Sequence, residues 1–139
     1  MTVAEDVRPL LPMIEPNDGA PFVAGSRCTA CGHTYVGQRE VCAKCTARDA
    51  MERVHLAETG KVWAWTVVHR SFPGVATPFV DVIVDLDDGA HIKGTLVDVD
   101  PQAVVPDMPV RMVFRDVIPA GADKPYLTYL FVPAQGAAA

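Results

Sequence analysis

The sequence has no long hydrophobic run: its longest apolar stretches are far below the roughly 18 residues that a membrane-spanning helix needs. Its first residues, MTVAEDVRPLLP, carry acidic residues and prolines where a signal peptide has an apolar core. We therefore expect no membrane association and a cytoplasmic location. A reducing compartment disfavours structural disulfides, so clustered cysteines there are best interpreted as metal ligands.

An excess of positive charge is also lacking. The 139 residues include 12 basic and 17 acidic ones, for a net charge of −5. From residue 55 onward there are 6 basic and 10 acidic residues. Proteins that bind nucleic acid neutralise backbone phosphates with a basic surface. We therefore expect no nucleic-acid partner.

Motifs for catalysis are missing as well. No serine, and no cysteine outside one short stretch, stands in a recognisable nucleophile motif, and no glycine-rich phosphate loop is present. Ser71 follows His69 by two residues, and neighbours at a strand end do not have the geometry of a base and its nucleophile. The acidic residues between 81 and 88 fit a solvated sheet face. The chain alone is not expected to be a catalyst.

The four cysteines all lie in CTACGHTYVGQREVCAKC, as two Cys-x-x-Cys pairs with ten residues between them. Two intervening residues allow both sulfurs of a pair to face one ion from a single tight turn, and Gly32 suits that turn. Four thiolates about 2.3 Å from the ion form a closed, structural zinc site. The spacing predicts a zinc ribbon with a hairpin over 32–41, whose ligands are Cys28, Cys31, Cys42 and Cys45.

Iron is the main alternative to zinc. The stretch CTACGHTYV resembles the first knuckle of a rubredoxin, and a site of four cysteines can hold iron. The second pair is followed by Thr46 instead of glycine. A rubredoxin-like electron carrier is therefore the less favoured interpretation.

Beyond residue 60 the pattern becomes the alternation of half-buried strands. Asp87-Asp88-Gly89 predicts a tight hairpin, and the proline-containing stretch 98–109 predicts a long connection. A long connection between the third and fourth of five strands is typical of an OB barrel. The sequence thus predicts a mainly β protein, with a four-cysteine zinc ribbon followed by a five-stranded OB-type barrel. The predicted strands are 61–69, 79–86, 91–97, 110–117 and 126–132.

These features divide the chain into an N-terminal arm (1–21), a rubredoxin-like ribbon (22–54), an OB domain (55–133) and a disordered tail (134–139). Four prolines make a long helix in the arm unfavourable. The arm is expected to pack either across its own domain or on a partner.

In order, the chain presents PFVAGSRCTACG, the second cysteine pair, GKVWAWTVVH, the DDG hairpin, GTLV, PDMPVRMVF and YLFVP. Over about residues 10–133 this order resembles the acyl-CoA-associated OB-fold proteins with an N-terminal rubredoxin-like zinc ribbon. The resemblance implies a non-catalytic accessory subunit of a thiolase-type acyl-CoA enzyme, with the catalytic residues on the partner chain. A hot-dog-fold hydratase is the alternative partner.

The resemblance also implies one structural zinc ion and a coenzyme A thioester shared with the partner. The family has no compact CoA-contact motif to transfer. From charge and loop position alone, we predict CoA contacts at Arg70, Phe72 and Lys93.

A second class of function stays open, namely a zinc-ribbon OB module that binds single-stranded nucleic acid. Such barrels combine a basic groove with stacking aromatics. The stacking residues would be Trp63, Trp65, Phe72 and Tyr126. The acidic balance of the barrel disfavours this function.

Overall fold

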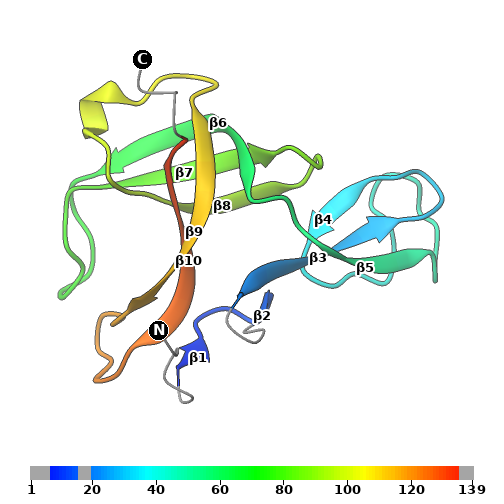
Figure 1. The fold of residues 1–139 in the computed structure, drawn as a ribbon, viewed down its shortest axis with the longest axis horizontal. Coiled ribbons are helices and arrows are strands. Elements are labelled where there is room, and N and C mark those ends of the chain that lie inside the picture. The colour runs from blue at the N-terminus through cyan, green and yellow to red at the C-terminus, as the bar shows by residue number, and fades with distance from the viewer. Residues whose placement is uncertain (1–6, 16–19, 135–139) are drawn as a thin grey trace.

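The computed structural model describes residues 7–15 and 20–134, and these are mainly β (Figure 1). Most of the predicted tail and parts of the predicted arm lie outside the described residues. The described strands are β1 (Arg8–Pro9), β2 (Ile14–Glu15), β3 (Phe22–Cys28), β4 (Thr34–Val36), β5 (Met51–His55), β6 (Thr59–Val68), β7 (Phe79–Leu86), β8 (His91–Leu96), β9 (Pro109–Val117) and β10 (Tyr126–Pro133). One 3₁₀ turn, η1 (Pro101–Ala103), lies between β8 and β9.

Strands β6 to β10 close into a barrel. Antiparallel pairs join β6 to β7, β7 to β8, β6 to β9 and β9 to β10. A parallel contact between β10 and β8 closes the ring at one register position, Leu96 with Phe131. This strand order is that of a five-stranded OB barrel, so the predicted fold class is confirmed.

The alternation of buried and partly buried residues in β7 directs one face of this strand into the barrel core. Val80, Val82, Val84 and Leu86 are buried, and the residues between them are only partly so. Removing such side chains from water contributes about 1.5–3 kcal/mol each. At the end of β7, Gly89 takes a φ of 94° and the amide of Leu86 donates to the carbonyl of Ala90 at 2.9 Å, which forms the predicted hairpin.

Phe131 fills the barrel interior and requires a glycine opposite it. Its side chain is fully buried. A Cβ at Gly94 would lie 2.8 Å from Cε2 of Phe131, a distance too short for two carbons. The glycine in the predicted GTLV strand therefore allows a ring to pack directly on the backbone of β8.

The ribbon differs from its prediction. A hairpin over 32–41 requires two strands there, and the structure has one, β4. The central strand is β3, which precedes the cysteines and pairs with both β4 and β5. After β4, Gly37 takes a φ of 76° and its amide donates to the carbonyl of Ala24 at 3.0 Å. After β4 the chain therefore stays hydrogen-bonded to β3, and it does not form a second strand antiparallel to β4.

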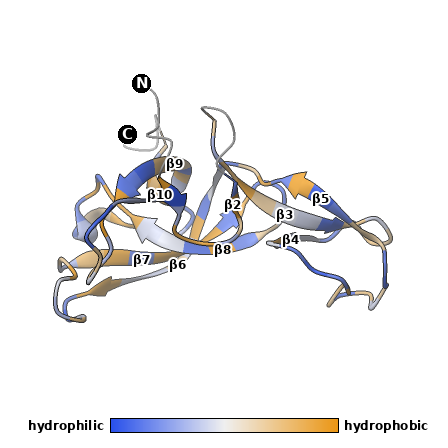
Figure 2. Cartoon of the chain, turned by 90° about the horizontal axis from the view of Figure 1, so that it is seen from below, coloured by the Kyte–Doolittle hydropathy of each residue, from blue (hydrophilic) through white to orange (hydrophobic). Residues whose placement is uncertain are grey.

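The described part of the arm joins the barrel to the ribbon (Figures 1 and 2). β1 pairs in parallel with the start of β10, and β2 pairs with the start of β3. Ile14 is 2% exposed and belongs to the barrel core cluster. Of the two placements expected for the arm, the structure supports packing on its own chain. The domain boundaries stay a prediction.

Among the described residues, no helix is long and apolar enough to cross a membrane.

Candidate metal centre and barrel groove

The two cysteine pairs form matching knuckles. The carbonyl of Cys28 accepts the amide of Gly32 at 2.7 Å, and the carbonyl of Cys42 accepts the amide of Thr46 at 2.9 Å. Gly32 has a φ of 81° and Thr46 a φ of 64°. Thr46 thus adopts the left-handed conformation that glycine takes in the first knuckle, although a β-branched residue is strained there. The missing glycine does not make the second knuckle different.

The four sulfurs converge as ligands of one ion would. They all lie within 4.8 Å of one another. The Sγ atoms of Cys28 and Cys45 are 3.6 Å apart, as are those of Cys31 and Cys42. A tetrahedral ion with bonds of about 2.3 Å to sulfur separates its ligands by about 3.8 Å. The donor set therefore fits a closed four-thiolate centre with no position left for water or substrate.

Tyr35 supports the second knuckle, a role that the cysteine spacing did not reveal. Its hydroxyl lies 3.4 Å from Sγ of Cys42 and accepts the amides of Ala43 at 3.0 Å and Lys44 at 3.2 Å. The hydrogen bond from Tyr35, aided by backbone amides, lowers the pKa of Cys42 to about 5. The same bond raises the pKa of Tyr35. Tyr35 thereby stabilises a thiolate, the form that binds metal.

The pKa values of Cys28 and Cys45 are shifted in opposite directions. The backbone amide of Cys31 leads the interactions that lower the pKa of Cys28. At Cys45 the amide of Ala47 lowers the pKa, but burial and the three neighbouring sulfurs outweigh it and raise the pKa to about 11. Four thiolates so close together repel one another, and a bound cation offsets that repulsion.

A groove lies on the barrel, over β8. It has a volume of about 820 Å³ and is bounded by the arm, by β10 and by the loops after β6 and β9. These loops and the outer faces of β7 and β8 are where an OB barrel holds its ligands. The exposed apolar side chains along the groove are Leu10, Leu11, Val75 and Ile118.

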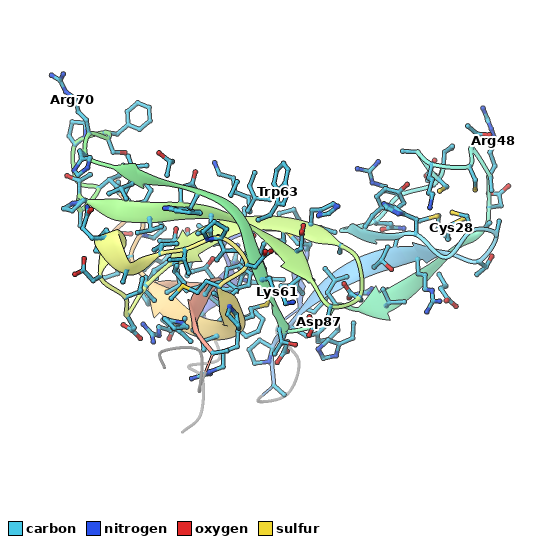
Figure 3. All side chains as sticks on the ribbon, turned by 90° about the horizontal axis from the view of Figure 1, so that it is seen from above. Cys28, Arg48, Lys61, Trp63, Arg70 and Asp87 are labelled. Carbon is cyan, nitrogen blue, oxygen red and sulfur yellow. The ribbon has the colours of Figure 1, made fainter. Side chains whose placement is uncertain are left out.

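The structure does not bring the three predicted CoA contacts together. Lys93 lines the groove, and its Nζ lies 3.1 Å from Oδ2 of Asp81. Arg70 and Phe72 lie in the loop after β6, outside the residues that line the groove, and Phe72 is 80% exposed. Figure 3 shows Arg70 at the end of the molecule opposite Cys28.

Trp63 is a further exposed aromatic. It lies at a bulge in β6, between Val62 and Ala64, and is 63% exposed. Figure 3 shows its ring pointing away from the barrel. The sequence suggested Trp63 only as a possible stacking residue.

A four-cysteine ribbon joined to an OB barrel defines a class of protein, and comparison with known proteins defines the family. A family model described as the C-terminal OB-fold domain of ChsH2 matches residues 53–115. A DUF35 domain-containing scaffold protein of Methanocaldococcus jannaschii is 39% identical over 102 residues, which are 71% of this chain and 72% of the relative.

Two further comparisons agree. The benzoylsuccinyl-CoA thiolase subunit BbsA of Geobacter metallireducens is 32% identical over 82 residues, 58% of this chain and 55% of that protein. A solved structure described as the Ltp2-ChsH2(DUF35) aldolase superposes with a TM-score of 0.65 at 26% identity, over 81% of this chain and 84% of that one. The chain belongs to the acyl-CoA-associated OB-fold family that its sequence resembles, the DUF35 proteins.

Proposed function

We propose that the chain is a non-catalytic accessory subunit of a thiolase-type acyl-CoA enzyme, which scaffolds the enzyme and helps to bind its CoA thioester. The observation that carries this proposal is the similarity to BbsA, a subunit of a benzoylsuccinyl-CoA thiolase. The likeness to a DUF35 scaffold protein and to the ChsH2 part of an aldolase supports the same role.

The described side chains support a division of labour with a partner. The His–carboxylate pairs, His91 with Asp85 and His55 with Glu58, are exposed. Among the hydrogen bonds of the described residues, neither pair is bonded to a serine or cysteine that could act as a nucleophile. The partner would then supply the nucleophile, the base and the oxyanion hole.

The ribbon would hold one structural zinc ion through Cys28, Cys31, Cys42 and Cys45. When bound, zinc supplies folding energy and no open coordination position. Tyr35 holds the second knuckle in the geometry that binding needs. Iron fits the same donors, so the metal itself has to be measured.

The CoA thioester would lie at the partner interface, with Arg70, Phe72 and Lys93 as the contacts that we propose. Arg70 can pair with a phosphate and Phe72 can cover the adenine ring. Because Asp81 already engages Lys93, a phosphate would have to compete for that ammonium group. We therefore expect the loop after β6 to make the larger contribution.

Co-purification tests the proposal. The tagged chain, recovered from its native host at low salt, is expected to bring a thiolase-fold chain in fixed stoichiometry, identified by mass spectrometry. Recovery of a hydratase would replace the thiolase as partner. If repeated experiments recover no acyl-CoA enzyme, the proposed function is overturned, and only the family membership of the chain remains.

The same preparation separates the alternatives. Metal analysis should give one zinc per chain and no colour. A red protein with visible absorbance would favour an iron electron carrier. Salt-dependent binding of a single-stranded oligonucleotide would favour the nucleic-acid module. We propose a cytoplasmic location for the complex, and fractionation of host cells tests it.

A further inference from the structure

Strand β8 has one backbone edge that is open along most of its length. On one side it pairs with β7 over the whole strand, from His91 to Leu96. On the other side it pairs with β10 only at Leu96. Within residues 7–15 and 20–134, no other strand pairs with β8. In the described residues, the edge from His91 to Thr95 therefore has no hydrogen-bonded strand beside it, although β4 lies near β8.

The register of the hairpin decides which amides face this edge. The amide of Leu86 donates to the carbonyl of Ala90, so the even-numbered residues of β8 exchange hydrogen bonds with β7. The odd-numbered residues point the other way. The carbonyl of Lys93 accepts the hydroxyl of Tyr129 at 2.6 Å, and the amide of Val97 donates to the carbonyl of Phe131 at 2.8 Å. The amide of Lys93 therefore faces the open side.

This edge runs along the groove. Residues 91–95 all line it. Of the eight large hydrophobic side chains that are exposed in the described residues, four line this same groove. They come from the arm and from the two loops that bound the groove. The site thus combines a backbone edge with apolar walls.

The charged side chains at the groove already have partners within the chain, so the groove does not need a charged ligand to neutralise them. Asp81 engages the ammonium of Lys93 at 3.1 Å, and Asp85 lies 2.5 Å from Nδ1 of His91. Each of these two side chains of the β8 edge is matched by a carboxylate of β7. The apolar walls therefore favour a peptide segment along β8, and an anionic group could reach Lys93 only by competing with Asp81.

The arm shows that an added strand can pair at the junction between β8 and β10, which we call the seam. β1 pairs in parallel with the start of β10, and the amide of Leu10 donates to the carbonyl of Leu127 at 2.7 Å. The arm then leaves the seam for the ribbon, where β2 pairs with β3. The β8 side of the seam stays unfilled, and an open strand edge is a template for pairing with another chain.

We propose that the open edge of β8 receives an extended apolar segment of the partner enzyme as an added strand. Main-chain hydrogen bonds with the outward-facing groups of residues 91–95, among them the Lys93 amide but not the Lys93 carbonyl that Tyr129 already engages, hold the segment. Its alternate side chains pack against the apolar walls of the groove. The inference rests on the proposed function, because it takes the acyl-CoA enzyme as the occupant.

Two substitutions at one position test the added strand. Lys93→Pro removes the amide that faces the groove and leaves the ladder to β7 intact, because that amide does not bond to β7. Lys93→Ala removes the same charged side chain but keeps the amide. The acyl-CoA enzyme that co-purifies with the wild-type chain, purified separately, is titrated against each variant by calorimetry.

We expect Lys93→Pro to weaken binding at least about tenfold relative to Lys93→Ala, the effect of leaving one main-chain partner unsatisfied. Amide exchange at Ile92 and Gly94 verifies that both variants keep the β7–β8 ladder. In the wild type, the Lys93 amide should exchange rapidly in the free chain and slowly in the complex.

Each other outcome overturns the inference in its own way. Equal binding by the two variants would reject the added strand and leave the partner proposal standing. A change in self-association without a change in enzyme binding would assign the edge to a second copy of the chain. If the wild-type chain captures no acyl-CoA enzyme, the proposed function and the inference both fail.

Discussion

Thr46 and Gly32 occupy equivalent positions in the two cysteine knuckles, with φ values of 64° and 81°. Each donates its amide to the carbonyl of the first cysteine of its pair. The left-handed conformation costs an L-residue about 1–2 kcal/mol and costs glycine almost nothing. One knuckle is relaxed and the other is strained, although their shapes match.

Thr46→Gly should therefore raise the free energy of unfolding by about 1 kcal/mol. Thr46→Ala is the matched control, because it removes the hydroxyl but keeps the Cβ that causes the strain. Urea unfolding of the metal-loaded chain measures both. A stability gain for alanine as large as that for glycine would show that φ is not the cause.

Gly32→Ala should have the opposite effect. A Cβ there meets only Nη2 of Arg27, at 3.9 Å, so the cost comes from the backbone and not from a clash. We expect a loss of about 1 kcal/mol on urea unfolding. An unchanged stability would mean that the first knuckle relaxes to another conformation.

Tyr35→Phe should weaken metal binding about tenfold, the lower range for loss of a group that orients a ligand. The ring stays, while the hydroxyl next to Cys42 and the amides of Ala43 and Lys44 is lost. Competition with a chromogenic zinc chelator measures the affinity. Tyr126→Phe serves as the control, since no hydrogen bond of the Tyr126 hydroxyl is present in the described part of the chain. An equal loss in both variants would contradict a local role for Tyr35.

Tyr129 should make the fold sensitive to alkali. Burial raises the pKa of Tyr129 to about 12, above the usual value of 10.0. Between these two values the unfolded chain loses the phenol proton while the folded chain keeps it, so the stability falls as the pH rises. Guanidinium unfolding at about pH 9 and about pH 11 should show a drop in the wild type that is smaller in Tyr129→Phe. Equal drops would assign the alkaline loss to other groups.

Asp88 should hold the ribbon to the barrel. Its carboxylate accepts the amide of Ala57, in the link before β6, at 2.7 Å and that of Ala90 at 3.2 Å. Asp88→Ala should cost about 1–2 kcal/mol in urea unfolding, because two amides lose their acceptor. It should also give the ribbon faster motion in ¹⁵N relaxation. Asp116→Ala, at an exposed position near the end of β9, is the control and should change neither measurement.

The barrel could be predicted because the sequence patterns that specify its strands and turns are local. In FVDVIVDL every second residue is apolar, and Asp87-Asp88-Gly89 marks the hairpin, so strand and turn can be read within a few residues. The convergence of the four cysteines could be predicted for the same reason. Their side chains converge within 4.8 Å, as the two short spacings require.

The features that sequence reasoning missed depend on distant partners. β3 became the centre of the ribbon because Cys28 pairs with Met51, which no short pattern shows. Tyr35 reaches Cys42 across a turn, and its role is visible only once the knuckles are in place. The groove is formed by the arm, β8 and two loops, which come together only in the folded barrel.

The pairing of β1 with β10 imposes an order of assembly. The first described strand can settle only after the last one exists, because Arg8 and Pro9 lie against Tyr126 and Leu127. The ribbon has no such dependence on β10 for its own pairs, so its knuckles can form while the arm is still unattached. Contacts between distant parts of a chain form slowly. A chain that stops short of β10 would leave Leu10 and Leu11 without this anchor, so completion of the barrel determines when the apolar arm is secured.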